Sequence, residues 1–270
     1  MPVAELIRYF NAADHGADSQ LYPQGERVEA WHGGLRLASL FQPIVDLRSE
    51  RVVGHQALLT ARRDGGEAAR SEAAYALCES EQAVVHFDRL CRTMHALNFL
   101  AQRRSTGGYL QLSVHPRHLQ AVQNQHGLVY EAILKRCGLA PQDIVLAIAA
   151  QGIDPAGHFS RALENYRHRG YRLAISITAD NMQPEAILAL RPDILCLPLR
   201  HADCELAARA AGVAVELSGV ETGADFRSAL TGGIKLAQGS LFGDPAVDCH
   251  PTHSPSRNPY NLFSQNGAHP

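Results

Sequence analysis

Apolar and polar positions alternate along the chain in short blocks that predict strands and helices in turn. Residues 37–41 and 56–60 are typical of short strands, and the turn-forming segment 45–54 separates them. A longer block predicts an amphipathic helix over residues 88–102, because its apolar side chains recur at helical spacing. These apolar positions are Phe87, Leu90, Cys91, Met94 and Leu97.

The same alternation continues to residue 238. The pattern predicts strands at 109–114, 144–148, 171–177, 194–197, 213–217 and 236–238, separated by helices at 128–137, 158–168, 184–190, 202–211 and 224–230. Near-continuous apolar strands between helices indicate a parallel sheet covered by helices. About seven or eight such units in about 210 residues is typical of a closed barrel. The expected fold class is therefore α/β, a TIM-like (β/α)8 barrel.

An open, doubly wound sheet is the alternative topology. It is disfavoured because no GxGxxG or GxxxxGK[ST] motif follows any predicted strand, and a nucleotide bound in that manner needs such a phosphate cradle.

The two ends of the chain differ in composition from the barrel segment. Residues 1–36 are expected to form an N-terminal helical and irregular extension, and residues 37–247 to form the barrel. Residues 248–270 repeat Pro, Ser, Asn and His, a composition that buries too little apolar surface to offset the entropy of ordering. A disordered tail is expected there.

Composition excludes several classes of function. The 25 basic and 27 acidic residues nearly cancel, which argues against a nucleic-acid partner, since such partners need clustered positive charge. No apolar run approaches the roughly 20 residues that span a bilayer, so no membrane association is expected. The six cysteines form no CxxC pair and are expected to be reduced, which indicates a cytoplasmic protein.

Several motifs in a fixed order resemble the EAL-domain family, bacterial barrels that hydrolyse or sense the second messenger cyclic di-GMP. The resemblance runs from about residue 37 to residue 247. It is carried by FQPIVDL (41–47), VVGHQALL (52–59), LQLSVHP (110–116), IVLAIAAQ (144–151), YRLAISI (171–177), RPDILCLP (191–198), LSGVET (217–222) and LAQGSLFGDP (236–245).

The resemblance implies a two-cation site in active members, held by carboxylates and one asparagine at the carboxyl ends of the barrel strands. In this chain the following positions of the family's site carry other residue types. The name-giving glutamate falls at Gln56, the asparagine at or near His115, a metal-binding glutamate at Ala147, the paired aspartates at Ser176 and Ile177, the lysine at Cys196, and the glutamate of the AEGVET motif at Ser218.

Two residues of the family's catalytic set keep their type, Glu221 and Gln238. A structural role is expected for both, at a strand end and at the barrel mouth. Asp180 lies downstream of the aspartate positions and is not expected to replace them. We therefore expect no catalytic residues, no metal and no cofactor.

The expected function is that of a catalytically inactive EAL-like regulatory module in bacterial signalling, acting through a protein partner. The alternatives are an effector that binds cyclic di-GMP without hydrolysing it, and residual phosphodiesterase activity. Binding of cyclic di-GMP is not expected, because Thr60 stands where the family has a phosphate-binding arginine. A rewired enzyme would require His115 and Cys196 to converge.

Overall fold

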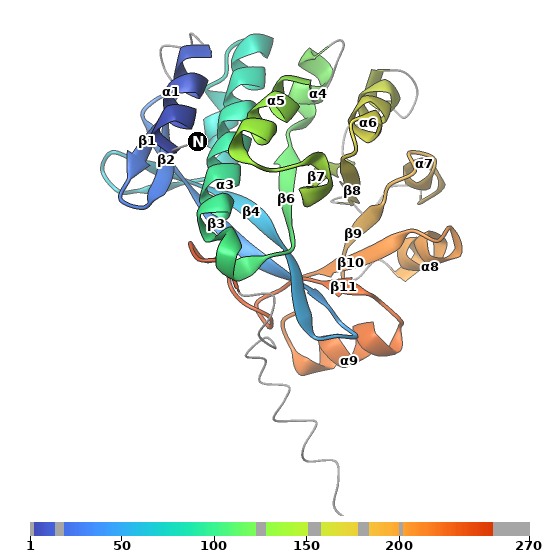
Figure 1. Ribbon diagram of the computed structural model, residues 1–270. Helices are drawn as coiled ribbons and strands as arrows, with labels where there is room; N and C mark the ends of the chain where they lie inside the picture. Colours follow the sequence, from blue (N-terminus) through green and yellow to red (C-terminus); the bar gives the residue numbers. More distant parts are fainter. Residues whose placement is uncertain are drawn as a thin grey trace, which may run out of the picture.

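Eight strands of the computed structural model close into a barrel, as expected (Figure 1). The structure describes residues 3–13, 19–122, 128–150, 158–177, 184–199 and 202–250. The ring of paired strands is β3 (Leu35–Asp46), β4 (Arg51–Arg63), β6 (Tyr109–Val114), β7 (Ile144–Ala149), β8 (Arg172–Ser176), β9 (Ile194–Pro198), β10 (Ala214–Ser218) and β11 (Leu236–Ala237). Strand β3 runs antiparallel to both of its neighbours, and the remaining strands of the ring pair in parallel.

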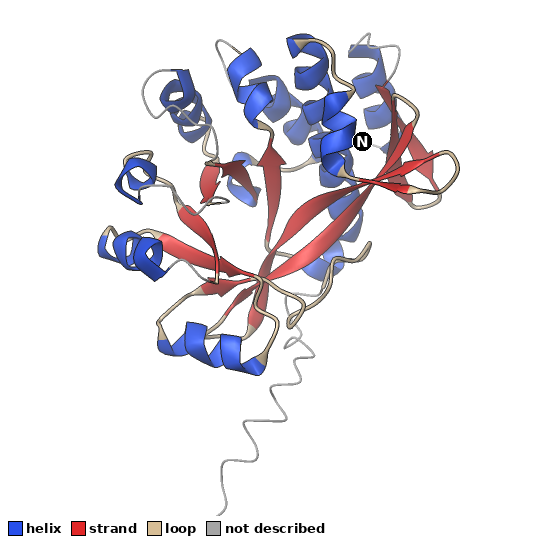
Figure 2. Cartoon of the chain, turned by 180° about the vertical axis from the view of Figure 1, so that it is seen from behind, coloured by secondary structure: helices blue, strands red, loops and turns tan. Residues whose placement is uncertain are grey.

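Helices lie around the outside of the strands (Figure 2). They are α2 (Ser71–Ala76), α3 (Glu81–Thr106), α4 (Pro116–Ala121), α5 (Leu128–Cys137), α6 (His158–His168), α7 (Pro184–Leu188), α8 (Ala202–Ala210) and α9 (Gly223–Thr231), with a 3-10 turn at Pro141–Asp143. The short helices α2 and α4 were not expected from the sequence pattern, because six residues are too few to display a helical repeat. No described helix combines the length and apolar character needed to cross a bilayer.

The core consists of two layers of apolar side chains. The larger layer lies between the strands and the helices, and a smaller cluster fills the barrel interior. The interior cluster contains Ile44, Tyr109, Val145, Ala147, Ala174, Ile194, Cys196 and Leu236. Gly54 makes room for the Tyr109 ring, since a Cβ at this position would lie 2.7 Å from that ring.

The N-terminal region differs from the irregular lead-in expected for residues 14–34. After α1 (Val3–Ala13), the strands β1 (Ser19–Gln24) and β2 (Arg27–His32) form an antiparallel hairpin that extends the sheet from β3. Alternate side chains of β2 are buried, a pattern that the polar composition of this segment conceals.

Asn98 on α3 joins this hairpin to the barrel, because its side chain accepts from the Val28 amide at 2.8 Å and donates to the Val28 carbonyl at 2.7 Å.

The start of the expected tail is also ordered against the barrel. Residues 248–250 follow a bridge between Ala246 and Phe41, and the buried Cys249 packs in the main core. The His250 amide donates to Nε2 of His55 at 2.9 Å. Backbone groups at this end therefore find buried partners, which the polar composition does not reveal. The rest of the expected tail, residues 251–270, lies outside the described residues.

The contact between His55 and His250 predicts a loss of stability in acid. Burial lowers the pKa of His55 from 6.5 to about 4, and only the neutral ring can accept from the His250 amide. A folded-state pKa below the unfolded value contributes stability above pH 6.5, and that stability is lost as the pH falls from 6.5 through 4. The loss attributable to His55 should reach about 3 kcal/mol at most.

Urea unfolding of the full chain at several pH values measures this loss. Over the same interval the His55→Gln variant should lose less stability than the wild type, because it removes the titrating group. The exposed His168 offers a matched control, since His168→Gln should follow the wild type. Equal pH dependence in the wild type and His55→Gln would contradict the prediction.

Candidate functional site

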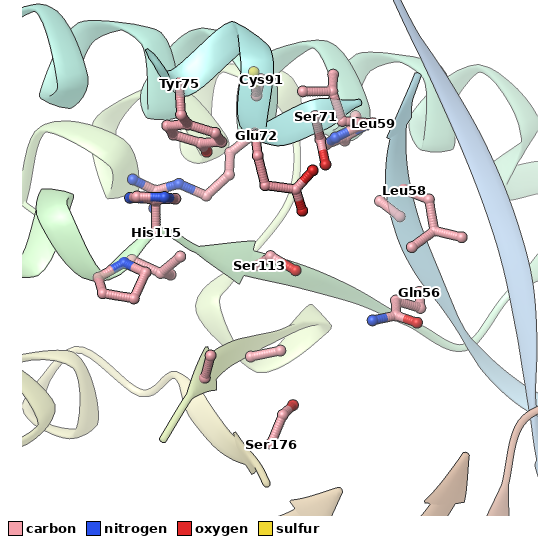
Figure 3. A pocket seen from close by; sticks show the side chains of 17 residues that line it. Gln56, Leu58, Leu59, Ser71, Glu72, Tyr75, Cys91, Ser113, His115 and Ser176 are labelled. Atoms are coloured by element: carbon pink, nitrogen blue, oxygen red, sulfur yellow. The ribbon is translucent and has the colours of Figure 1, made fainter. Parts of the chain in front are cut away.

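A cavity of about 600 Å³ lies at the carboxyl ends of β4, β6, β7 and β8, beneath the helices α2 and α3 (Figure 3). This is the end of a parallel barrel at which binding sites form. The cavity is lined by Gln56, Ala57, Leu58, Leu59, Ser71, Glu72, Tyr75, Cys91, Arg92, His95, Ser113, Val114, His115, Pro116, Ala147, Ala149 and Ser176. It therefore includes four of the positions singled out from the sequence, namely Gln56, His115, Ala147 and Ser176.

Gln56 and Gln238 form a direct bond across the barrel mouth. Gln238 Nε2, on a side chain only 4% exposed, donates to Gln56 Oε1 at 2.7 Å. The bond joins the segment after β11 to the middle of β4, so the retained Gln238 has a structural partner. The next residue, Gly239, packs directly against the backbone of Val220. A Cβ at Gly239 would lie 2.0 Å from the Val220 carbonyl oxygen. Only glycine fits at this position, because the two backbone segments lie too close together for a side chain.

The structure adds a residue that the sequence reasoning missed on β6. Ser113 is exposed to the cavity and pairs in register with Ala147 of the neighbouring strand. His115 lies beyond the strand end, where its side chain caps α4 by accepting from the Arg117 amide at 3.2 Å. The alternation of side chains along a strand could have pointed to Ser113, because it lies two residues after Gln111 on the same face.

Apolar and hydroxyl side chains form the floor of the cavity. Ala147 pairs with Ala174, and Ala149 pairs with Ser176, so the ends of β7 and β8 present methyl groups and one hydroxyl. Figure 3 shows the side chains of Ser113, Ser176 and Gln56 directed into one common space.

The remaining positions singled out from the sequence lie outside the cavity lining. Ile177 is buried in the core between the strands and the helices. Ser218 Oγ donates to the Leu197 carbonyl at 3.3 Å, and the side chain of Glu221 is exposed. Cys196 points into the barrel interior, where burial raises its pKa well above 9 and keeps the thiol protonated. Asp180 is outside the described residues.

The rewired-enzyme alternative requires contact between His115 and Cys196. The structure gives these residues different partners: the His115 ring stacks on Tyr75 at 3.9 Å between centroids, whereas Cys196 lies near Gln111 and Glu216. A protonated thiol is also a weak nucleophile. The arrangement therefore offers no Cys–His pair in the described part of the chain.

A buried carboxylate organises the wall of the cavity. Asp88 on α3 is fully buried and contacts Arg92 Nη2 at 2.6 Å and His118 Nδ1 at 3.1 Å. Its other oxygen accepts from the Tyr75 hydroxyl and from the His115 amide, each at 3.0 Å. Burial opposes the charge of Asp88, but these partners together hold its pKa below the ordinary value. The network joins α2, α3 and α4.

The electrostatic character of the cavity follows from this network. Its charged lining residues are Glu72 and Arg92, and Arg92 is engaged with Asp88. The carboxylate of Glu72 points into the open space above Ser113 (Figure 3).

The lining residues do not fit a pair of divalent cations. Such cations require several carboxylate or carbonyl oxygens converging on each ion. Here Gln56 Oε1 is bonded to Gln238, and the ends of β7 and β8 supply alanines and a serine. Among the described residues, no group of three or more His, Cys, Asp or Glu side chains is placed to hold a metal ion.

Comparison with solved structures finds barrels of the same kind. YkuI of Bacillus subtilis, an EAL-domain protein solved with cyclic di-GMP and calcium, aligns with a TM-score of 0.69 and 19% identity over 85% of this chain and 60% of that chain. BlrP1 of Klebsiella pneumoniae, as a calcium and cyclic di-GMP complex, aligns with a TM-score of 0.67 and 20% identity over 88% and 64%. A standalone EAL protein of Vibrio cholerae O395, bound to cyclic di-GMP, aligns with a TM-score of 0.62 and 19% identity over 81% and 96%.

This chain thus spans less than two thirds of YkuI and of BlrP1. At these identities the likeness shows the fold. No curated protein matches the chain significantly by sequence.

These neighbours contradict one expectation from the sequence, that cyclic di-GMP binding should not occur. All three similar structures hold this nucleotide. The expectation was drawn from lost charges such as the one at Thr60, whereas a barrel mouth also offers a cavity and uncharged hydrogen-bonding groups. Loss of charged side chains is therefore an insufficient reason to exclude the ligand.

The family model for the EAL domain matches residues 29–201, more than half of the chain. The match starts within β2, before the expected boundary at residue 37, and ends before the GVET and QGSLFGDP motifs. With the barrel fold and the neighbouring structures in agreement, the chain belongs to the EAL domain family.

Proposed function

We propose that this protein is a catalytically inactive EAL domain that acts as a regulatory module. The observation that carries the proposal is the set of side chains at the carboxyl ends of the barrel strands. Gln56, Ser113, Ala147 and Ser176 are uncharged, whereas metal-dependent hydrolysis of a phosphodiester needs several carboxylates, which the resemblance places at Gln56, Ala147 and Ser176. The bond from Gln238 further occupies Gln56 Oε1.

Regulation through a protein partner fits a complete barrel whose strand ends at the cavity carry uncharged side chains. A fold does not fix a function, and the outer surfaces of a barrel remain available for contacts when its site is lost. The exposed apolar side chains of Leu199 and Leu206, 43% and 64% exposed, lie at and near α8 and offer such a surface. We place this activity in bacterial signalling in the cytoplasm, where the described cysteines, all unpaired, stay reduced.

A second candidate function is binding of cyclic di-GMP without hydrolysis. The observation that favours it is the cavity itself, about 600 Å³ at the carboxyl ends of the barrel strands, in a fold whose similar structures were solved with this nucleotide. The stacked rings of Tyr75 and His115 at its wall, and the hydroxyls of Ser113 and Ser176, are groups that a nucleotide can contact.

The proposal of inactivity predicts no turnover even after one repair. Gln56→Glu restores a single carboxylate, while Ala147 and Ser176 still lack charge, so a cation stays weakly bound. Residues that act as one catalytic unit are strongly non-additive. Incubation of the wild type and of Gln56→Glu with cyclic di-GMP and Mn²⁺, followed by chromatography of the linear product, should give the rate of the metal-only control. Clear turnover by either protein would overturn the proposal.

Calorimetry separates the two modes of regulation. If the cavity binds cyclic di-GMP, heat should be detected at about 100 μM ligand, a concentration that detects a free energy of binding near 5 kcal/mol. Ser113→Phe should abolish that heat with an unchanged unfolding temperature, because Ser113 faces the open cavity. The exposed Ser49 provides a control outside the cavity, as Ser49→Phe should bind like the wild type. Absence of heat in the wild type would dismiss this second candidate.

The partner-based mode makes its own prediction. The tagged full chain should retain a partner in stoichiometric amount from the lysate of its host, with and without added cyclic di-GMP. No stoichiometric partner across several growth conditions would contradict this mode.

A further inference from the structure

A polar cluster lies inside the barrel directly beneath the cavity. It consists of Gln111 on β6, Cys196 on β9 and Glu216 on β10, which are 1%, 7% and 1% exposed. Gln111 Nε2 lies 3.5 Å from Glu216 Oε1 and 3.9 Å from Cys196 Sγ. The Cys196 thiol also interacts electrostatically with Glu216 and with Ser176, which lines the cavity. A series of polar side chains therefore leads from a buried carboxyl group to the cavity floor.

The surroundings of Glu216 contain no cation that pairs with it in the described part of the chain. Its titratable neighbours are Cys196 and Tyr109, both neutral at ordinary pH, and Leu236 on β11 is apolar. Arg172 on β8 is committed elsewhere, with its guanidinium 4.6 Å from the Tyr109 ring centroid. Ionisation of a carboxyl group in such surroundings has a high free-energy cost, because burial disfavours the charged form.

Two complementary atoms of the cluster lack hydrogen-bond partners. Glu216 Oε2 and Gln111 Oε1 are both buried and unsatisfied, although the two side chains face each other. When Glu216 is ionised, both atoms are acceptors and cannot bond. When Glu216 is protonated, Oε2 becomes a donor and the facing amide oxygen accepts from it, while the amide Nε2 donates to Oε1. A single proton thus satisfies both atoms.

We propose that Glu216 and Gln111 form a proton-binding site beneath the cavity floor, and that the protonation state of this site changes the floor of the cavity. The proton completes an acid–amide pair with two hydrogen bonds between β6 and β10, and its loss leaves only the bond from Gln111 Nε2 to Glu216 Oε1. Burial raises the pKa of Glu216 to about 7, so the exchange falls near neutral pH. The inference does not depend on the regulatory role proposed above.

Two connections carry the effect to the cavity. Gln111 lies two residues before Ser113 on the same face of β6, so a shift of the Gln111 amide moves the strand end that carries Ser113. The ionised carboxylate keeps the Gln111 Nε2 donor at Oε1, and its Oε2 turns to the other donors nearby, Cys196 Sγ–H and the unsatisfied Tyr109 hydroxyl. The interaction of Cys196 with Ser176 on the cavity floor changes as a result.

The linkage has a distinctive sign. Because the pKa of Glu216 is higher in the folded state than in the unfolded state, Glu216 stabilises the fold fully below about pH 4.5. This stabilisation is lost as the pH rises through 7. Above pH 7 the loss is constant, because Glu216 is ionised in both states. Over the interval between, the unfolding equilibrium constant rises by up to about tenfold per pH unit.

Urea unfolding of the full chain between pH 4 and 9 tests the site. Glu216→Gln cannot ionise and keeps an amide pair with Gln111, so the ratio of the wild-type to the variant unfolding constants should grow between pH 4.5 and 7 and then level off. The control is Glu26→Gln, at an exposed turn residue, which should follow the wild type. A ratio independent of pH across that interval would overturn the proposal.

Nuclear magnetic resonance of the folded protein provides a second measurement. The side-chain carboxyl carbon of Glu216 should titrate with a midpoint near pH 7, and the backbone amides of Ser113 and Ser176 should shift with the same midpoint. In Glu216→Gln these amide shifts should disappear. A Glu216 midpoint near its ordinary value, or a midpoint near 7 with unmoved amides, would overturn the proton site or its coupling to the cavity respectively. Because the wild type alone gives this result, a variant that fails to fold leaves the test intact.

Discussion

The buried carboxylate of Asp88 is the constraint on which the cavity depends. A charge with no solvent exposure is stable only while every partner stays in place, and those partners come from α2, α3 and the start of α4. Removing one partner from such a network typically costs about 3–5 kcal/mol. The short helix α2 has too few residues to be stable alone, so the bond from Tyr75 to Asp88 places it over the barrel mouth. The cavity wall is thus held in place because groups from three helices together stabilise the buried charge of Asp88.

The scaffold of the barrel and the chemistry at its mouth are specified by different residues. Closure depends on strand pairing and on the apolar interior cluster around Ala147, Ala174 and Ile194, which requires no charge at the strand ends. The neutral bond between Gln56 and Gln238 adds a contact across the ring that a metal-bound carboxylate could not make in the same way. The pairing and the interior packing of this barrel therefore do not depend on charged side chains at its strand ends.

The sequence predicted much of the fold, because buried parallel strands and their helices have strong apolar patterns. The strand Tyr109–Val114 and the helices Leu128–Cys137 and His158–His168 have their expected bounds. The hairpin before β3 was missed, since its buried positions alternate within a polar segment. At the site, Gln56, His115, Ala147 and Ser176 were named from motif order and line the cavity, whereas Glu72 and the Asp88 network could not be placed there. Their positions depend on side-chain direction and on contacts between elements distant in sequence, such as Asp88 with His118.

The placement of carboxyl groups in this barrel has a physical consequence. On β10 the strand end carries Ser218, and the carboxyl group lies two residues earlier at Glu216, on the same face but inside the barrel. At a strand end, a carboxylate is solvated and available to a cation. One layer deeper, the same group loses water and finds an amide and a thiol, so its neutral form becomes the stable one at moderate pH. A shift of two residues along one strand thus exchanges a group that attracts cations for a group that binds a proton, without any change in the backbone of the barrel.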